Sequence, residues 1–343
     1  MTAVTFMPYF PNSSIDEKFG PFHLWNWYQY KDKYAKDQAT AAIFERYFSI
    51  YKRKYGELEG RIAVIDYEHA DPLSATLPTE IARFADAVML AYLVTIPLTS
   101  NDGFFASSSD NFTAFKHTLP NSLAISLTFG SYVRTEQAGS LDYLIFMTPQ
   151  HVPDQSYGVG DHKLLRQMVQ ICEKNDLETE RLFRSLQWVG FAFSNAPGHI
   201  YESRIVAMTT AFEILLDMPD ENKPQEFSER IRALLIPNKL PLSTRTRLTK
   251  AGNPKAETDN AVGWWCREFY GLRSKVVHGD KLQQSHYKTN DVENLRIALH
   301  LFRECIEGIL VRMGMLLSTE REMQFWFNPQ WIDALKLPHE AFY

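Results

Sequence analysis

The spacing of apolar residues changes along the chain and divides it into two parts. Before residue 150, β-branched and aromatic residues gather in short runs that are typical of strands, namely Arg61–Tyr67, Ser122–Thr135 and Leu141–Thr148. Helical spacing is found in Asp37–Lys54 and in Thr79–Leu93. The pattern therefore predicts an α+β N-terminal domain over residues 1–150, for which we expect a sensing or regulatory role.

From residue 161 onward the apolar residues recur every three or four positions, as they do on one face of a helix. The helices predicted in this way are Asp161–Glu173, Leu177–Phe193, Tyr201–Leu216, Pro224–Leu235, one that begins at Ala261 and a long one that begins at Asn290. Glu293 follows Asn290 at the spacing of a capping box. The second part is therefore predicted to be an all-α helical bundle over residues 161–317.

Three segments lack this periodicity. Prolines and glycines in Thr148–Asp161 indicate a linker between the two domains. Lys239–Lys255 is basic and contains two prolines and a glycine, so we expect an exposed loop between two helices. The aromatic tail, residues 318–343, is expected to dock onto its own domain or onto a partner.

Composition narrows the classes of protein to consider. A hydrophobic content of 45% is enough for a core, and a net charge of −5 means that nucleic acid must be bound by a local basic patch. The chain contains no apolar run of membrane-spanning length and no basic segment followed by an apolar one, so we expect a cytoplasmic protein without a membrane span. Cys172, Cys266 and Cys305 lie far apart within helical patterns, which favours buried thiols over disulfides or a metal site.

One segment, YGLRSKVVHGD, combines residues suited to chemistry on a phosphate. Arg273 and His278 stand five positions apart where an apolar helix runs into Gly279. An imidazole transfers protons near neutral pH, and a guanidinium stabilises charge on phosphate oxygens. The pair therefore predicts cleavage of RNA by its own 2′-hydroxyl, with no metal and no cofactor. The sequence contains no glycine-rich nucleotide-binding motif that would suggest a nucleotide cofactor.

Helix geometry constrains how this pair can act. Five residues of a regular helix turn through about 500°, which leaves the two side chains roughly 140° apart. They converge if the helix ends or distorts near Val277, which Gly279 favours. A second copy of the chain, contributing a second pair across a twofold axis, is the other way to complete a site.

The segment LRSKVVHGD, preceded by Ser203–Asp217 and followed by the helix from Asn290, resembles the HEPN superfamily, most closely its Apea-like branch, over Asp161–Leu317. The resemblance implies a bundle of four or five helices and a homodimer whose paired motifs line one cleft. It also implies a metal-independent endoribonuclease of anti-phage defence or of a toxin system. A further alternative is the toxic half of a toxin–antitoxin pair, held silent by a separate antitoxin or regulatory protein. By position, Arg273 and His278 match the catalytic residues, and Glu213 matches a polar position that faces the cleft.

The motif departs from the family pattern at the residue after the arginine. Family members commonly have Asn, His or Asp there, whereas this chain has Ser274 followed by Lys275, both of which we expect to support the site. Because serine orients a substrate less firmly, the alternative is an inactive HEPN module that dimerises and binds a nucleotide, RNA or a partner protein. A purely structural role for the pair, with the arginine bound to an acidic neighbour and the histidine capping the helix, is also open.

Further basic residues offer contacts to RNA phosphates, although a solvated loop is the favoured interpretation. They are Lys239, Arg245, Arg247 and Lys250. Arg204 is expected to be the electrostatic partner of Glu213 or a surface charge, and His286 lies close enough to the motif to assist it.

Overall fold

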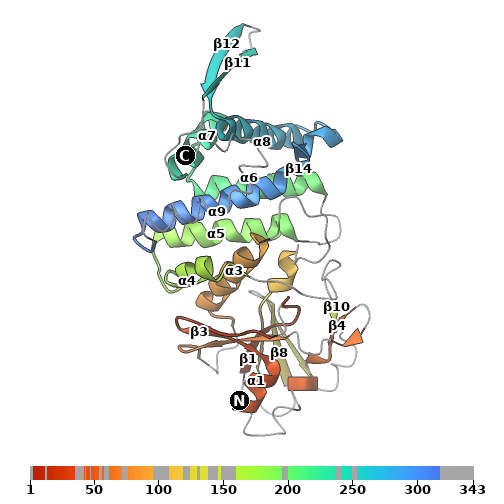
Figure 1. The fold of residues 1–343 in the computed structure, drawn as a ribbon. Helices are drawn as coiled ribbons and strands as arrows, with labels where there is room; N and C mark the ends of the chain where they lie inside the picture. Colours follow the sequence, from red (N-terminus) through yellow and green to blue (C-terminus); the bar gives the residue numbers. More distant parts are fainter. Residues whose placement is uncertain are drawn as a thin grey trace. The chain divides into compact units, whose positions relative to one another are not determined.

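The chain divides into two compact units, with most of helix α5 in the second. Figure 1 shows the elements of both units. The computed structural model describes residues 3–11, 14–34, 42, 44–46, 48–53, 56–57, 62–71, 76–95, 108–118, 124–129, 132–137, 146–147, 160–194, 200–235, 242–248 and 253–316.

An antiparallel sheet forms the first unit, with its strands in the order β2-β3-β6-β1-β7-β8-β9. Its strands are β1 (Ala3–Met7), β2 (Asp16–Phe19), β3 (Phe22–Asn26), β6 (Ala63–Tyr67), β7 (Phe115–Thr118), β8 (Ala124–Phe129) and β9 (Tyr132–Gln137). A smaller sheet contains β4 (Tyr51–Arg53), β5 (Gly56–Glu57) and β10 (Phe146–Met147). The helical elements of this unit are α1 (Trp27–Tyr34), α3 (Thr79–Leu93), η1 (Ser109–Phe112) and α4 (His162–Val169).

Strand register sorts the apolar residues of this sheet onto two faces. Val64 is paired with both Phe6 and Trp25, so these three lie on one face, within a buried aromatic cluster. On the other face the ring of Phe22 stacks on Phe84 of α3, with centroids 4.4 Å apart. Both faces of the sheet are therefore covered, as an α+β domain requires.

The N-terminal elements follow the hydrophobic pattern closely. Helix α3 has the predicted bounds, and the predicted strand Arg61–Tyr67 contains β6. The predicted strand Ser122–Thr135 is two strands, β8 and β9, which pair as a hairpin. The predicted helix Asp37–Lys54 overreaches at its end, because residues 51–53 form β4.

The second unit is mostly helical, as predicted. Its helices are α5 (Leu177–Phe193), α6 (Tyr201–Leu215), α7 (Lys223–Leu234), α8 (Ala261–Val277) and α9 (Asn294–Arg312). Helix α4, which the periodicity grouped with these helices, lies in the first unit, where the backbone N–H of Asp161 donates to Ala91 of α3. In the described part of the chain, no helix is both long and apolar enough to cross a membrane.

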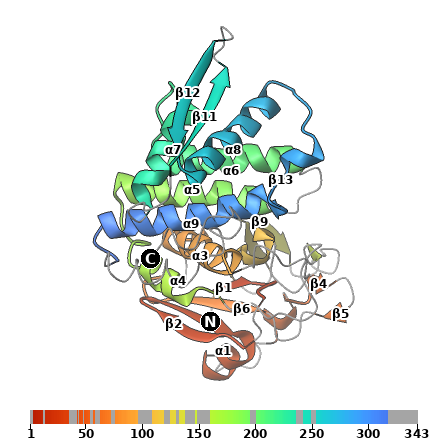
Figure 2. The same cartoon turned by 45° about the horizontal axis from the view of Figure 1, so that its top comes forward.

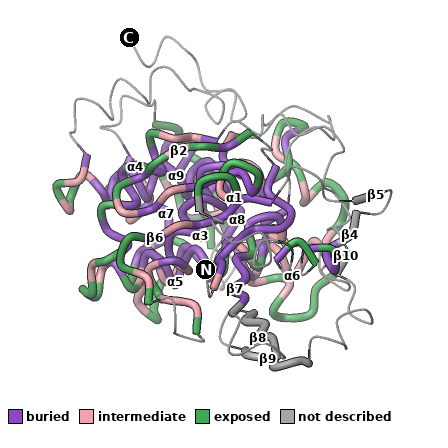
Figure 3. Tube along the Cα trace, turned by 90° about the horizontal axis from the view of Figure 1, so that it is seen from below, coloured by how far each residue is buried: buried purple, intermediate pink, exposed green. Residues whose placement is uncertain are grey.

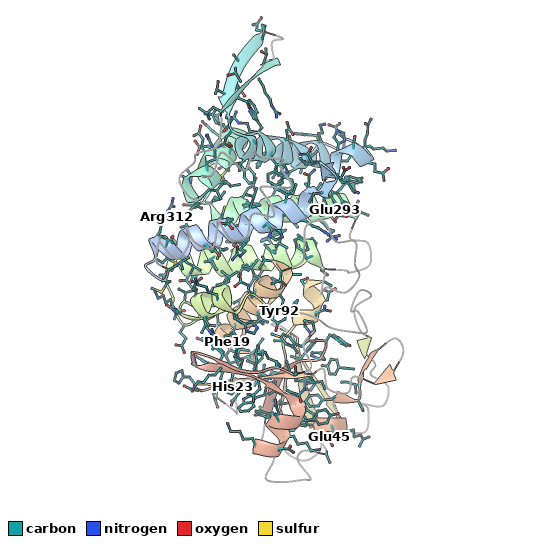
Figure 4. The ribbon with its side chains drawn as sticks, viewed as in Figure 1. Phe19, His23, Glu45, Tyr92, Glu293 and Arg312 are labelled. Carbon is teal, nitrogen blue, oxygen red and sulfur yellow. The ribbon has the colours of Figure 1, made fainter. Side chains whose placement is uncertain are left out.

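Helix α9 is the most deeply buried element of this unit. Figures 1 and 2 show it beside α5 and α6, and Figure 4 labels Glu293 and Arg312 at its two ends. Every residue of α9 except Arg296, Val311 and Arg312 is buried, including the charged residues Arg303, Glu304 and Glu307. Figure 3 colours the chain by this burial. The helix therefore contributes to the core on all its faces.

Two local predictions in this unit were wrong. Much of the expected loop Lys239–Lys255 forms a β-hairpin of β11 (Ser243–Leu248) and β12 (Pro254–Asp259), which extends away from α7 and α8 in Figures 1 and 2. Helix α9 begins at Asn294 rather than at Asn290, because the preceding residues form a second small hairpin of β13 (Lys288–Thr289) and β14 (Val292–Glu293). Of the predicted linker Thr148–Asp161, residues 148–159 lie outside the described residues, as does the aromatic tail, and Asp161 is the N-cap of α4.

Candidate active site on helix α8

Helix α8 has a well-defined beginning and end. The side chain of Asn260 caps its N-terminus by accepting a hydrogen bond from the backbone N–H of Gly263, at 2.8 Å. At the C-terminus Gly279 has φ +82°, and its N–H donates to Val276 while the N–H of Asp280 donates to Lys275. This pair of hydrogen bonds is a Schellman motif, so Gly279 terminates the helix as its position predicted.

The helix is regular up to this end, and this regularity fixes the directions in which the side chains of Arg273 and His278 leave it. The N–H of His278 still donates to Ser274 in the helical pattern, at 3.1 Å. The two side chains therefore leave the helix about 140° apart. His278 is exposed, and within the described residues its imidazole has no hydrogen bond or ion pair and does not contact Arg273. A single chain does not bring the two groups together.

Arg273 points toward helix α6 and meets the predicted residue Glu213. Its Nη2 lies 3.8 Å from Glu213 Oε1, and the guanidinium lies over the ring of Tyr270, 5.7 Å from the centroid. The side chain is 26% exposed, and its Nε has no hydrogen-bond partner among the described residues. Arg273 is thus oriented by charge and by an aromatic face, and its Nε is a buried donor that no described group satisfies.

Glu213 is the centre of a small polar cluster. It accepts a hydrogen bond from the Tyr270 hydroxyl, and Lys223 Nζ lies 3.9 Å from its Oε1. Burial and this hydrogen bond both raise the pKa of Tyr270, so the phenol remains a donor. Arg204 is not the partner of Glu213 as expected, because its Nε donates to the backbone oxygen of Ala192.

Tyr270 and Lys223 were not identified from the sequence. Tyr270 precedes Arg273 by three residues and so shares its side of the helix, which was a usable signal. Lys223 has no local signal, since it reaches Glu213 from a different helix.

The two residues after Arg273 have separate environments. Ser274 is partly exposed, and its backbone oxygen accepts the hydrogen bond from His278. Lys275 Nζ lies 3.4 Å from Nε2 of His286. Lys275 and His286 therefore form a pair of their own, and neither belongs to the cluster around Glu213.

The four basic residues suggested for RNA contacts are only partly described. Arg245 donates to Glu268 at 2.8 Å, and its guanidinium lies 4.9 Å from the Trp264 centroid. Its charge is therefore compensated on the hairpin surface. The side chain of Arg247 and all of Lys239 and Lys250 lie outside the described residues.

Comparison with known proteins assigns neither a family nor a function to the chain. No protein-family model, curated protein or solved structure matches the chain significantly. Within the described residues, no group of three or more His, Cys, Asp or Glu side chains is arranged to hold a metal ion.

Proposed function

We propose that the chain is a HEPN-type endoribonuclease that cleaves single-stranded RNA in the cytoplasm, as an effector of phage defence or of a toxin system. The observation that carries the proposal is the exposed imidazole of His278, without a partner in the described structure, near the same helix end as the partly exposed guanidinium of Arg273. An exposed histidine and a half-buried arginine are the groups that transesterification of RNA requires.

The divergence of the two side chains favours a site built from two copies of the chain. Because α8 is regular, Arg273 and His278 of one chain are directed to different sides of the helix. Val277, beside the histidine, is 54% exposed, so this end of α8 is open to a second copy. A twofold axis near this end gives one site two guanidinium and two imidazole groups.

In this proposal one His278 imidazole accepts the proton of the 2′-hydroxyl as that oxygen attacks the adjacent phosphorus. Arg273 donates hydrogen bonds to the nonbridging oxygens, where negative charge builds up. The 5′-oxygen leaves with a proton donated by His278 of the partner subunit. The products are a 2′,3′-cyclic phosphate and a 5′-hydroxyl, and no metal ion takes part in these steps.

The test is incubation of total RNA with wild type, Arg273→Ala and His278→Ala in the presence of EDTA, followed by mapping of the product ends. Arg184→Ala removes an exposed arginine of α5 and is the matched control. Cleavage by wild type and the control alone, with cyclic phosphate ends, supports the proposal. Cleavage that requires magnesium and leaves a 5′-phosphate contradicts it.

The second candidate is a HEPN module that binds RNA, a nucleotide or a partner protein without cleaving. Ser274 favours it, since serine orients a substrate less firmly than the residues common at that position, and so does the net charge of −5. Dimers of wild type that bind RNA, leave it intact and lose affinity in Arg273→Ala identify this function. If expression of the wild-type protein is toxic to the host cell and His278→Ala relieves this toxicity, the protein is a nuclease. Co-purification with the expressed protein then tests for a partner protein that neutralises it.

A further inference from the structure

We infer that helix α8 carries a second ligand site, a pocket for a small phosphomonoester in which Lys275 and His286 hold the phosphate. The pocket has a volume of about 320 Å³ and lies between α8 and the segment that leads into α9. Its volume falls in the range of small-molecule sites. Lys275 leaves α8 roughly 200° from Arg273, so this pocket and the Arg273 cluster occupy different sides of the helix.

The tautomer of His286 directs two hydrogen-bond donors, His286 Nε2 and Lys275 Nζ, toward the same point in the pocket. Its Nδ1 accepts a hydrogen bond from the backbone N–H of Gln283, at 2.9 Å, so the neutral ring carries its proton on Nε2. Nε2 lies 3.4 Å from Lys275 Nζ, which is also a donor. Two donors do not hydrogen-bond each other, but one phosphate oxygen between them accepts from both.

Charge in the lining also favours an anion. Lys275 and Lys288 have no carboxylate partner among the described residues. The acidic lining residue, Glu268, is paired with Arg245 at 2.8 Å. The lining arginine is neutralised as well, because Arg267 binds Glu257 and Asp259. Lys275 therefore has no carboxylate near it among the described residues, whereas Lys288 lies opposite Glu293 in the β13–β14 hairpin without forming an ion pair with it.

The segment that carries His286 is held firmly in place. Asn294 ties this segment to α8: its Oδ1 accepts from Trp265 Nε1 of α8 and from Thr289 Oγ1, and its Nδ2 donates to the backbone oxygen of His286. On the next residue the Tyr287 hydroxyl donates to Glu202. A site fixed in this way loses little conformational entropy when a ligand binds.

An apolar wall on α8 also lines the pocket, on the same side of the helix as Lys275. Trp265 and Phe269 stack with centroids 4.9 Å apart, and Leu272 completes this wall. An ester with an apolar or aromatic body therefore fits better than inorganic phosphate alone. We expect phenyl phosphate to bind more tightly than phosphate for this reason.

The test is calorimetric titration of the full chain, without RNA, with phenyl phosphate and with inorganic phosphate. Lys275→Met removes one phosphate donor and should weaken phenyl phosphate binding about tenfold or more. Lys275→Arg should retain much of the affinity. Lys281→Met, which removes an exposed lysine just beyond the same helix, is the matched control and should bind as wild type does.

The site is independent of the proposed nuclease, and the variants separate the two. Arg273→Ala and His278→Ala should retain the component of phenyl phosphate binding that Lys275→Met removes, whatever they do to RNA cleavage. Absence of phenyl phosphate binding at millimolar concentration overturns the inference. So does equal weakening by Lys275→Met and Lys281→Met, or a Lys275→Met variant that loses RNA binding while its affinity for phenyl phosphate is unchanged.

Discussion

Nε of Arg267 lies 3.1 Å from Oδ2 of Asp259, whose carboxylate is completely buried. The other oxygen of Asp259 lies 2.9 Å from Nη1 of Arg232, so one carboxylate neutralises two guanidinium groups. Ser228 donates to it as well. Because Asp259 ends β12, Arg232 lies on α7 and Arg267 lies on α8, this ion cluster attaches the long hairpin to two helices of the second unit.

Removing the carboxylate should therefore be costly. We expect Asp259→Ala to destabilise the second unit by about 3–5 kcal/mol, because it leaves Arg232 without a counter-charge and Arg267 with Glu257 alone. Chemical denaturation followed by circular dichroism measures this. Glu268→Ala is the control, since its ion pair with Arg245 is exposed and should contribute less than about 1 kcal/mol. Equal losses in both variants would count against the ion cluster as a structural centre.

The approach of Asp259 to α8 also depends on a glycine. A Cβ at Gly263 would lie 2.0 Å from Oδ1 of Asp259, whereas a Cβ at Gly271 of the same helix meets nothing within 4 Å. Gly263→Ala should destabilise the protein by roughly 1–3 kcal/mol through this overlap. Gly271→Ala should stabilise it by about 0.5–1 kcal/mol, because alanine favours the helix. Thermal unfolding of the two variants distinguishes them by the sign of the shift in Tm.

Glu213 should contribute to stability as well as to the orientation of Arg273. Glu213→Ala removes the acceptor of the Tyr270 hydroxyl, and we expect a loss of roughly 1–3 kcal/mol from this unpaired, buried donor. In a Tyr270→Phe background the same substitution should cost less, since the hydroxyl is already absent. Urea unfolding of wild type, the two single variants and the double variant gives the coupling energy between Glu213 and the Tyr270 hydroxyl. A coupling energy of zero would show that the hydrogen bond does not stabilise the fold.

His117 should make the first unit sensitive to acid. Burial lowers the pKa of His117 to about 3, while an unfolded histidine titrates near its ordinary value of 6.5. Between these two values the unfolded chain binds the additional proton, so stability falls as pH decreases from about 6.5 toward 3. His117→Phe should show a flatter decline over this range, measured by Tm in a pH series. Parallel profiles for the variant and wild type would argue against this role of His117.

Asp86 should make the first unit less stable as pH rises, which is opposite to the effect of His117. Burial on α3 raises its pKa to about 7, so the folded protein retains a proton that the unfolded chain releases above the ordinary value of 3.8. Stability should therefore fall as pH rises from about 4 to 7. Asp86→Asn removes this penalty, and its advantage over wild type should grow over that interval. An advantage that does not change with pH would assign the effect to packing.

The periodic helices could be predicted because their sequence signal is local. The predicted and observed bounds of α3 and α5 agree, since apolar residues recur at helical spacing along both segments. The β11–β12 hairpin lacks such a signal. Its residues are polar on both faces, and its strands are joined by backbone pairing and by a hydrogen bond between Thr244 and Thr258. A strand without an apolar face looks like a loop in the sequence.

The start of α9 was missed for a different reason. Asn290 and Asp291 both have positive φ, 49° and 68°, and they form the two-residue turn between β13 and β14. Asparagine serves equally well as a helix cap, so the capping-box spacing with Glu293 pointed to the wrong structure. The choice depends on Asn294, whose side chain is engaged by Trp265 from another helix.

The candidate site was partly accessible to sequence reasoning. Arg273, His278 and Glu213 were singled out, and the structure brings the first and third within 3.8 Å although they are 60 positions apart. The separation of Lys275 from Arg273 follows from their helical spacing, but its pairing with His286 depends on tertiary contacts. Contacts of that kind are not encoded in the spacing of neighbouring residues.

The burial of α9 has a consequence for biosynthesis. Its residues are buried almost from end to end, and it packs against both α6 and α7. The ribosome makes α9 after every other helix described in this unit. The earlier helices therefore emerge with an apolar surface that has no partner until α9 has been translated. Final assembly of the second unit must follow its synthesis, and a nascent chain arrested before residue 294 should be a substrate for chaperones.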